Sequence, residues 1–348
     1  MKTILLSLSI FCVLLLSSCT SSQQPKEQPR SKTDAGEFLG QWTLDIAGGW
    51  VGWLEVRQSE SNLTGDLLWK WGSVTPVDTM FIASGNYLVA ARGNNVMYSF
   101  TPEGKAEKHR VSNEWVEVIR DGDKIAGKMI SPRPDGKGVD TVAFTGVKLP
   151  TVPSAPDLTK VKYGKPEVLF NGKDLTGWKL IDEKLKNGFS VAKGILITDP
   201  AQKEGEPYIE YGNLRTIKEF EDFNLKIEVN VPQGSNSGVY LRGMYEIQVL
   251  DSYKKPLDSH NMGAVYSRVR PTVNAEKPAG EWQSLDITLC DRHVTVILNG
   301  TKIIDNQPVF GPTGGALKSD VFAPGPIFLQ GDHGKVSFRN IVLTPIVK

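Results

Sequence analysis

Alternation of apolar and polar residues runs through most of this chain and predicts β-strands. Residues 223–229 read FNLKIEV and residues 53–57 read WLEVR, so every second side chain in each is apolar. Residues 293–298 and 301–305 flank Asn299-Gly300, which predicts a hairpin with a type I′ turn. No amphipathic stretch is long enough for a core helix. We therefore expect an all-β protein, with a two-sheet sandwich built from about ten short strands in residues 167–348.

Prolines divide the chain into two predicted domains. Pro150, Pro153, Pro156 and Pro166 fall in a segment with few large apolar residues, which is typical of a stiff linker. We expect the linker at residues 150–166, a small β-barrel or sandwich domain at 37–149, and the sandwich at 167–348. The first domain holds six of the chain's eight tryptophans. Although tryptophan rings also stack on sugars, we interpret these side chains as core, and the sequence gives this domain no function.

The N-terminus has the layout of a bacterial lipoprotein signal. Lys2 precedes an apolar run at residues 4–16 that is too short to span a bilayer. The following Leu16-Ser17-Ser18-Cys19 resembles a lipobox, whereas a plain signal peptide cleaved nearby is the alternative. We expect residues 1–18 to be a signal peptide, Cys19 to carry lipid, and residues 19–36 to form a flexible tether. The protein would then lie in the cell envelope, anchored to the membrane and either periplasmic or surface-exposed.

Charge and cysteine content exclude several other classes. Lys and Arg number 40 against 39 Asp and Glu, so the chain lacks the basic excess of a nucleic-acid-binding protein. Removal of the signal and lipidation of Cys19 would leave Cys290 as the last thiol, which excludes a disulfide framework. We expect Cys290 to be buried and inert.

One predicted strand pair carries a polar face that suits a sugar. Residues 236–251 read NSGVYLRGMYEIQVLD, and strand alternation places Tyr240 and Arg242 on the same side. If Gly243-Met244 forms a tight turn, Glu246 and Gln248 join them on that side. Planar donors and acceptors beside an aromatic ring are typical of a sugar site. The alternative is an ordinary solvated sheet face with a structural ion pair between Arg242 and Glu246.

Five ordered motifs resemble the 3-keto-disaccharide hydrolase family. They are VLFNGKDLTGW at residues 168–178, the strand pair at 236–251, GAVY at 263–266, KPAGEW at 277–282, and LQGDHGKVSFRNI at 329–341. Each is weak alone, but five in order are specific. The resemblance implies a concanavalin A-like jelly roll, as in lectins and glucanases, with a carbohydrate in its concave sheet. It also implies sugars that are already oxidised at C3.

A 3-keto group acidifies the C2 proton, so the implied reaction needs a base, an enolate stabiliser and an acid for the leaving group. Elimination of the C1 substituent would be followed by hydration. The candidate catalytic residues are Glu246, His333 and Arg242. The candidate substrate-binding residues are Tyr240, Gln248, Asp251, His260, Tyr266, Lys277 and Gln330.

Two other functions and one cofactor stay open. The chain could be a non-catalytic carbohydrate-binding lipoprotein, because lectins share the architecture. A conventional glucanase-type glycoside hydrolase would need a second carboxylate beside Glu246, and Asp251 has the opposite strand parity. A divalent metal ion held by histidine and carboxylate oxygens would stabilise an enolate, although no ligand spacing in the sequence demands one.

Overall fold

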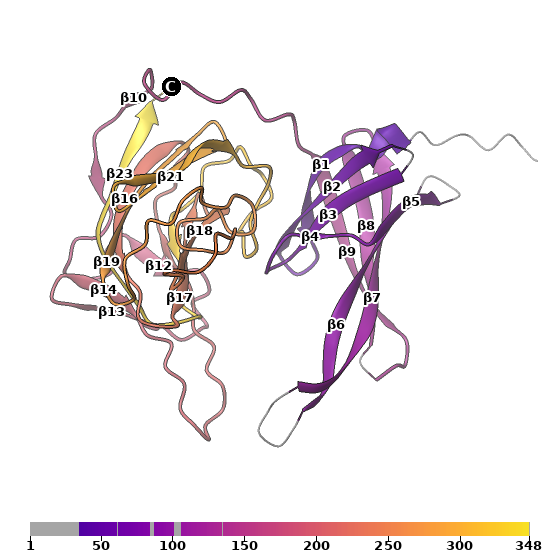
Figure 1. The fold of residues 1–348 in the computed structure, drawn as a ribbon, viewed down its shortest axis with the longest axis horizontal. Helices are drawn as coiled ribbons and strands as arrows, with labels where there is room; N and C mark the ends of the chain where they lie inside the picture. The colour runs from indigo at the N-terminus through magenta and orange to yellow at the C-terminus, as the bar shows by residue number, and fades with distance from the viewer. Residues whose placement is uncertain (1–34, 61, 84–86, 101–105, 134, 348) are drawn as a thin grey trace, which may run out of the picture. The chain divides into compact units, whose positions relative to one another are not determined.

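β-Strands form nearly all regular structure in the computed structural model (Figure 1), which confirms the expected all-β class. The structure describes residues 35–60, 62–83, 87–100, 106–133 and 135–347. Within these ranges the one helical element is the short 3-10 helix η1 (Ala35–Phe38), and no described helix has the length and apolarity to cross a membrane. The predicted signal peptide, Cys19 and the tether up to residue 34 lie outside the described residues.

The N-terminal part is a single antiparallel sheet of nine strands in the order β4-β3-β2-β1-β9-β8-β7-β6-β5. Its strands are β1 (Gly40–Ile46), β2 (Trp50–Ser59), β3 (Asn62–Trp69), β4 (Thr75–Pro76), β5 (Thr79–Ala83), β6 (Tyr87–Phe100), β7 (Ala106–Asp121), β8 (Lys124–Pro132) and β9 (Val139–Lys148). The sheet curls, because its two end strands are consecutive in the chain and β3 also approaches β5. Of the two architectures expected here, the structure therefore has the barrel-like one.

The tryptophans of this sheet do not all serve as core. Trp42 is fully buried and Trp53 is nearly so, as predicted. In contrast, Trp50, Trp71 and Trp115 are 38%, 62% and 37% exposed, so the interpretation of these three as core residues is wrong. Trp50 is the first residue of β2 and Trp71 follows the last residue of β3, so neither lies in the middle of a strand.

The C-terminal part is a sandwich of two sheets, as expected for a jelly roll. The larger sheet has the order β13-β14-β23-β16-β19-β20-β21, with β10 and β11 also paired to β23. Its strands are β10 (Lys162–Tyr163), β11 (Glu167–Val168), β13 (Phe189–Ala192), β14 (Ile195–Thr198), β16 (Phe223–Asn230), β19 (Trp282–Cys290), β20 (His293–Leu298), β21 (Thr301–Pro308) and β23 (Val336–Val347).

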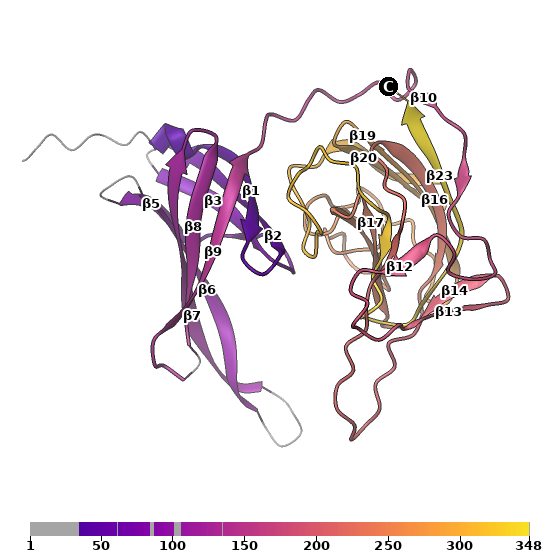
Figure 2. The ribbon, with the colours of Figure 1, turned by 180° about the vertical axis from the view of Figure 1, so that it is seen from behind.

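The smaller sheet has the order β12-β15-β22-β17-β18. It consists of β12 (Trp178–Leu180), β15 (Leu214–Thr216), β17 (Asn236–Leu241), β18 (Tyr245–Leu250) and β22 (Phe328–Leu329). Figures 1 and 2 show β12 and β17 in one layer and β16 and β23 in the other. Every second residue of β16 is buried, and these side chains meet Val239 and Ile247 of the smaller sheet in a common core. The opposite face of β17 and β18 is therefore free to carry polar side chains.

Residues 35–348 group into one unit by their contacts. Val51, Trp53 and Leu68, from β2 and β3, belong to the same apolar cluster as the sandwich core. The proline-rich segment is also held at two points, since Arg292 donates to the carbonyl of Pro150 and Asn306 to that of Pro156. The division into domains at residues 150–166 stays a prediction from sequence.

Candidate active site

A cavity of about 860 Å³ lies over the smaller sheet of the sandwich. This volume falls within the range of pockets that bind small molecules. Its lining includes side chains from three adjacent strands and the loop that follows them, namely Asn236, Tyr240, Glu246, Gln248, Phe328, Gln330, Asp332 and His333. The cavity is the natural place to look for the sugar site that the sequence predicts.

Strand alternation brings three predicted residues into this cavity. In the antiparallel register of β17 and β18, Tyr240 pairs with Glu246 and Gly238 pairs with Gln248. Side chains of Tyr240, Glu246 and Gln248 therefore share one face. The carboxylate of Glu246 lies directly over Gly238, where a Cβ atom would collide with it. A glycine at this position is what leaves room for the acid.

Glu246 is a buried acid with an unusual affinity for its proton. It is 4% exposed, and burial raises its pKa from 4.5 to about 7. The Tyr240 hydroxyl donates to Oε2 of Glu246 at 2.8 Å, and this contact limits the rise in pKa. The hydroxyl of Thr313 accepts a hydrogen bond from the backbone N–H of Glu246 and so fixes the position of that residue. A carboxyl group with a pKa near neutrality is suited to general acid–base catalysis.

The hydroxyl of Tyr240 couples the acid to the backbone. It lies 2.8 Å from Glu246 and 2.7 Å from the carbonyl oxygen of Gly314. A phenol has one proton, so it donates to the carboxylate while Glu246 is ionised. Once Glu246 is protonated, the carboxyl group donates to Tyr240 and Tyr240 donates to Gly314. The ring itself is fixed, because it stacks on Phe328 with 3.7 Å between centroids.

His333 forms a second titrating group at the cavity. Its Nδ1 atom lies 2.7 Å from Oδ1 of Asp332. This hydrogen bond raises the pKa of His333 above 6.5, and the charge of Glu246 acts in the same direction. Because Asp332 occupies Nδ1, the other ring nitrogen is left for a ligand. The cavity thus holds a carboxyl group and an imidazole that favour each other's charged forms.

Two amide oxygens at the cavity have no protein partner. Oδ1 of Asn236 and Oε1 of Gln330 are buried and accept no hydrogen bond from the described residues. Both residues line the cavity. Buried acceptors are normally paired, and an unpaired one costs about 1–3 kcal/mol. Hydroxyl groups of a bound sugar would supply the missing donors.

Arg242 does not share the face of Tyr240, so that prediction is wrong. The strand ends at Leu241, and Arg242 has a φ of 56°, which turns the chain before strand alternation reaches it. Its buried guanidinium donates to the carbonyl oxygens of Val321 and Ala323 at 2.8 and 2.7 Å. Arg242 does not line the cavity. Among the described residues, its guanidinium also forms no ion pair with the carboxylate of Glu246. Its contacts are those of a residue that secures a loop.

Three of the predicted substrate-binding residues also lie outside the cavity lining. Asp251 accepts a hydrogen bond from the backbone of Gly234, as its opposite strand parity allows. Lys277 donates from Nζ to the carbonyl of Trp282. Both ring nitrogens of His260 are engaged, by Asp258 at 2.5 Å and Ser73 at 2.8 Å. Tyr266 and Gln330, in contrast, do line the cavity.

The sequence interpretation missed several residues of the cavity. Asp332 and Asn236 stand within quoted motifs, and Asn236 shares the parity of Tyr240, so alternation alone could have found Asn236. Other lining residues, such as Asp182, Asn213 and Arg215, come from segments without any signal, and Trp50 and Trp71 had been interpreted as core. Only the fold brings these segments together.

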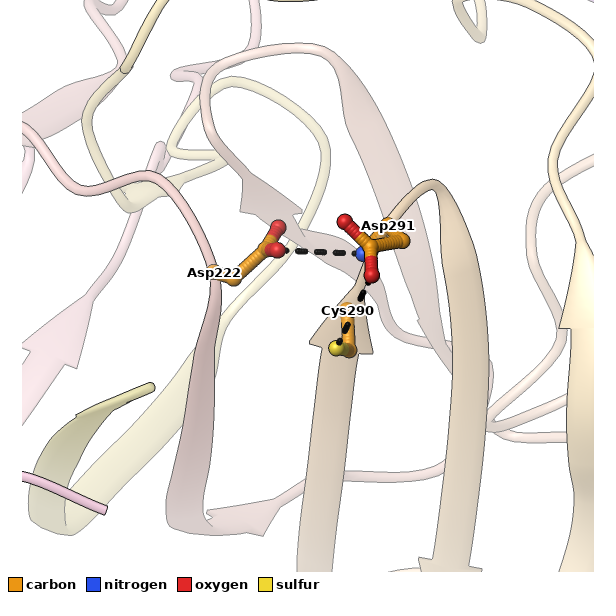
Figure 3. Close-up of side chains that lie close together, drawn as sticks. All are labelled: Asp222, Cys290 and Asp291. Atoms are coloured by element: carbon orange, nitrogen blue, oxygen red, sulfur yellow. Dashed lines mark hydrogen bonds between the residues drawn. The ribbon is translucent and has the colours of Figure 1, made fainter. Parts of the chain in front are cut away.

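A different group of side chains has the composition of a metal site. Asp222, Cys290 and Asp291 place their ligand atoms within 4.8 Å of one another, and the described residues offer no other such triad (Figure 3). Hydrogen bonds among these three residues explain why they lie close together. Asp222 accepts from the backbone N–H of Asp291 at 3.1 Å, and the Cys290 thiol contacts the Asp291 carboxylate. Cys290 is buried, as predicted. The cavity carboxylates do not form such a triad, so the possible metal ion remains a prediction.

Comparisons with known proteins place these features in a family. The profile of the 3-keto-alpha-glucoside-1,2-lyase-like domain matches residues 165–344. A candidate glycosyl hydrolase from Parabacteroides distasonis ATCC 8503 is 30% identical, with 56% of this chain and 93% of that chain covered and a TM-score of 0.42. A second one from the same organism is 23% identical, with 52% and 94% covered and a TM-score of 0.41.

A non-specific endo-beta-1,3(4)-glucanase of family GH16 is 12% identical, with 56% of this chain and 92% of that chain covered and a TM-score of 0.34. Among curated proteins, none matches the chain. The profile match covers just over half of the 348 residues and includes the whole predicted strand pair and the motif at residues 329–341 that contains His333. The chain therefore belongs to the 3-keto-alpha-glucoside-1,2-lyase-like family, whose members act on glycosides.

Proposed function

We propose that this protein cleaves the glycosidic bond of 3-keto-glycosides or 3-keto-disaccharides by proton abstraction at C2 and elimination, followed by hydration. The observation that carries the proposal is the state of Glu246, a buried carboxyl group with a pKa of about 7 at the base of a sugar-sized cavity. A base of this strength matches a C–H bond that is acidified by a neighbouring ketone. An ordinary glycoside offers no such proton.

In the first step, the carboxylate of Glu246 takes the C2 proton, and the C–H electron pair forms the enolate of the C3 ketone. Collapse of the enolate expels the C1 oxygen and leaves a C1=C2 double bond. Asp332 raises the pKa of His333 and so favours the protonated imidazole, which supplies the proton to the leaving oxygen. Water then adds across the double bond, with hydroxyl at C1 and hydrogen at C2, and gives the free 3-keto sugar.

The cavity also explains how the substrate would be held. Asn236 and Gln330 offer unpaired acceptors for sugar hydroxyls. Gln248 uses its Oε1 atom for the backbone of Val249, which leaves its amide NH₂ group as a donor for a sugar oxygen. With Arg242 held elsewhere, the Gln248 amide is a candidate donor to the enolate oxygen.

A conventional glycosidase mechanism fits the geometry less well. In β18 the position that alternates with Glu246 is Gln248, and both side chains line the cavity. The second carboxylate that a pair on one strand would require is thus an uncharged amide. Asp332 is engaged by His333, which gives it the role of orienting the imidazole.

The experiment compares a 3-keto-disaccharide with its unoxidised parent, with and without chelator, and follows release of the leaving sugar. We expect cleavage of the oxidised substrate alone. Glu246→Gln and His333→Asn should each lower turnover by about 10²–10⁴-fold while binding changes far less. Deuterium at C2 should slow the wild-type reaction. Glu228→Gln, which changes a carboxylate outside the cavity, is the matched control.

Each other function predicts a distinct result. Equal cleavage of the unoxidised parent would establish a conventional glycosidase. Binding of both sugars without turnover, across several metal ions, would establish a carbohydrate-binding protein. Loss of activity with chelator that a divalent ion restores would show that the reaction needs a metal.

A further inference from the structure

The cavity extends beyond the acid–base residues to an aromatic pair from the N-terminal sheet. Trp50 and Trp71 both line it. Their rings meet edge to face, with 4.5 Å between centroids and an interplanar angle of 78°. They are nevertheless among the exposed large apolar side chains, at 38% and 62%. The pair thus gives the cavity an apolar surface that its own protein leaves uncovered.

The loop that carries Trp71 is bound firmly beside the acid–base residues. Gly315 donates to the carbonyl of Lys70 at 3.2 Å. The backbones of Gly72 and Gly314 approach so closely that a Cβ atom at Gly314 would collide with Gly72. Since the carbonyl of Gly314 accepts the Tyr240 hydroxyl, one backbone contact separates the tryptophan loop from the residue that contacts Glu246. The position of Trp71 is thereby tied to that of the reacting groups.

Further along the same loop, two more hydrogen bonds fix its path. The backbone of Val74 donates to Oγ of Ser267 at 2.9 Å, and Ser73 contacts His260 at 2.8 Å. The loop is therefore anchored by its backbone and by Ser73, whereas the side chain of Trp71 contributes little to the packing of the core. Exposed aromatic surface beside a polar cavity is typical of a ligand-binding face, since the flat C–H face of a ring packs well on indole.

We propose that Trp50 and Trp71 bind the leaving group of the substrate, and that this leaving group is a ring with an apolar face, such as a pyranose or an aryl group. This inference rests on the proposed function. The polar residues around Glu246 suit the hydroxyls of the 3-keto sugar, while the tryptophan pair suits a less polar ring. The N-terminal sheet would then select the substrate that the sandwich cleaves.

The test measures kcat and KM of Trp50→Ala and Trp71→Ala with three 3-keto-glucosides: a disaccharide, a p-nitrophenyl glycoside and a methyl glycoside. We expect KM to rise about 3- to 10-fold for the two ring-bearing substrates, the range that one aromatic contact supplies. The methyl glycoside, which has no second ring, should be unaffected. Trp71→Phe should recover part of the lost affinity. Trp115→Ala is the matched control, because Trp115 is 37% exposed on the same sheet but lies outside the cavity lining.

The comparison between substrates separates the two proposals. An equal change for all three glycosides, or none for any, would overturn the leaving-group site while the proposed function stands. A larger effect for the aryl glycoside than for the disaccharide would identify an aryl leaving group, and the reverse a sugar. If the wild type turns over none of them, calorimetric binding of the same ligands to wild type and Trp71→Ala decides the point. Equal affinities there would refute the site independently of catalysis.

Discussion

The hydroxyl oxygen of Tyr240 lies 2.8 Å from Oε2 of Glu246, and both side chains are buried, which disfavours a charged carboxylate. That contact favours the ionised acid and holds its pKa at about 7 against the effect of burial. The reactivity of Glu246 is therefore set by a balance between desolvation and one hydrogen bond, and each part of the balance is accessible to mutation.

Tyr240→Phe removes the hydrogen bond and keeps the ring that stacks on Phe328. The pKa of Glu246 should rise, because the ionised form loses its donor. Since the base must be ionised, the acid limb of the profile of kcat/KM against pH should move to higher pH. A pH–rate profile on a 3-keto-glycoside measures it. An unmoved acid limb would mean that another group is the base.

Asp332→Asn should act on the opposite limb. The hydrogen bond that His333 donates to Asp332 raises the pKa of His333, so its loss lowers that pKa. As the acid that protonates the leaving group, His333 must carry its proton, and the alkaline limb should therefore move to lower pH. Substrates with better leaving groups need this proton less and should show a smaller effect. A mutation that lowers the rate equally at all pH values would assign Asp332 a purely structural role.

Glu246→Gln should stabilise the protein at alkaline pH. The pKa of this group is about 7 in the folded state and 4.5 as its ordinary value, so between these values the folded state keeps a proton that the unfolded chain releases. The contribution of Glu246 to the free energy of unfolding is thus fully present below pH 4.5. It is lost as the pH rises through 7, by about 3 kcal/mol in total. Urea unfolding at pH 5 and pH 8 should show a gain for the variant chiefly at pH 8.

Glu228→Gln provides the contrast for that measurement. Although burial opposes it, hydrogen bonding to Arg339 lowers the pKa of Glu228. Its contribution to stability is therefore present at neutral pH and lost in acid, and its replacement should destabilise at pH 8. Equal effects of the two variants on unfolding would contradict the assignment for Glu246.

Gly238→Ala should reduce activity without unfolding the protein. A Cβ atom at this position collides with the carboxylate of Glu246, which must shift. Displacement of a catalytic group by about 1 Å costs up to about 10²-fold in rate. Gly164→Ala, where the added atom finds ordinary contacts, is the control. Turnover and melting temperature together distinguish a moved base from a damaged fold.

Cys19 should carry lipid at the N-terminus of the mature protein, because Leu16-Ser17-Ser18-Cys19 has the pattern of a lipobox. Mass spectrometry of the protein from membranes of a bacterial host checks this. Cys19→Ser should release the protein from the membrane fraction. An unmodified N-terminus at another residue would establish a plain signal peptide.

The sequence by itself determined the β-class of this protein and the face shared by Tyr240, Glu246 and Gln248. These follow from local rules, since strand alternation acts over a few positions. His333 was found through the motif at residues 329–341 that resembles the family. Strand alternation no longer holds where the strand ends, at Leu241. Arg242, the next residue, therefore points toward the carbonyl oxygens of Val321 and Ala323.

Tertiary structure decided the rest. It placed Asp182, Arg215 and the tryptophan pair at one cavity, although these residues are far apart in sequence. Burial and hydrogen bonding also decided which carboxyl group has a pKa near neutrality, because a pKa depends on the whole surroundings of a group. His260 and Lys277 were candidate substrate-binding residues in the sequence, yet packing gave them partners elsewhere. Chemistry at this site depends on neighbours that only the fold supplies.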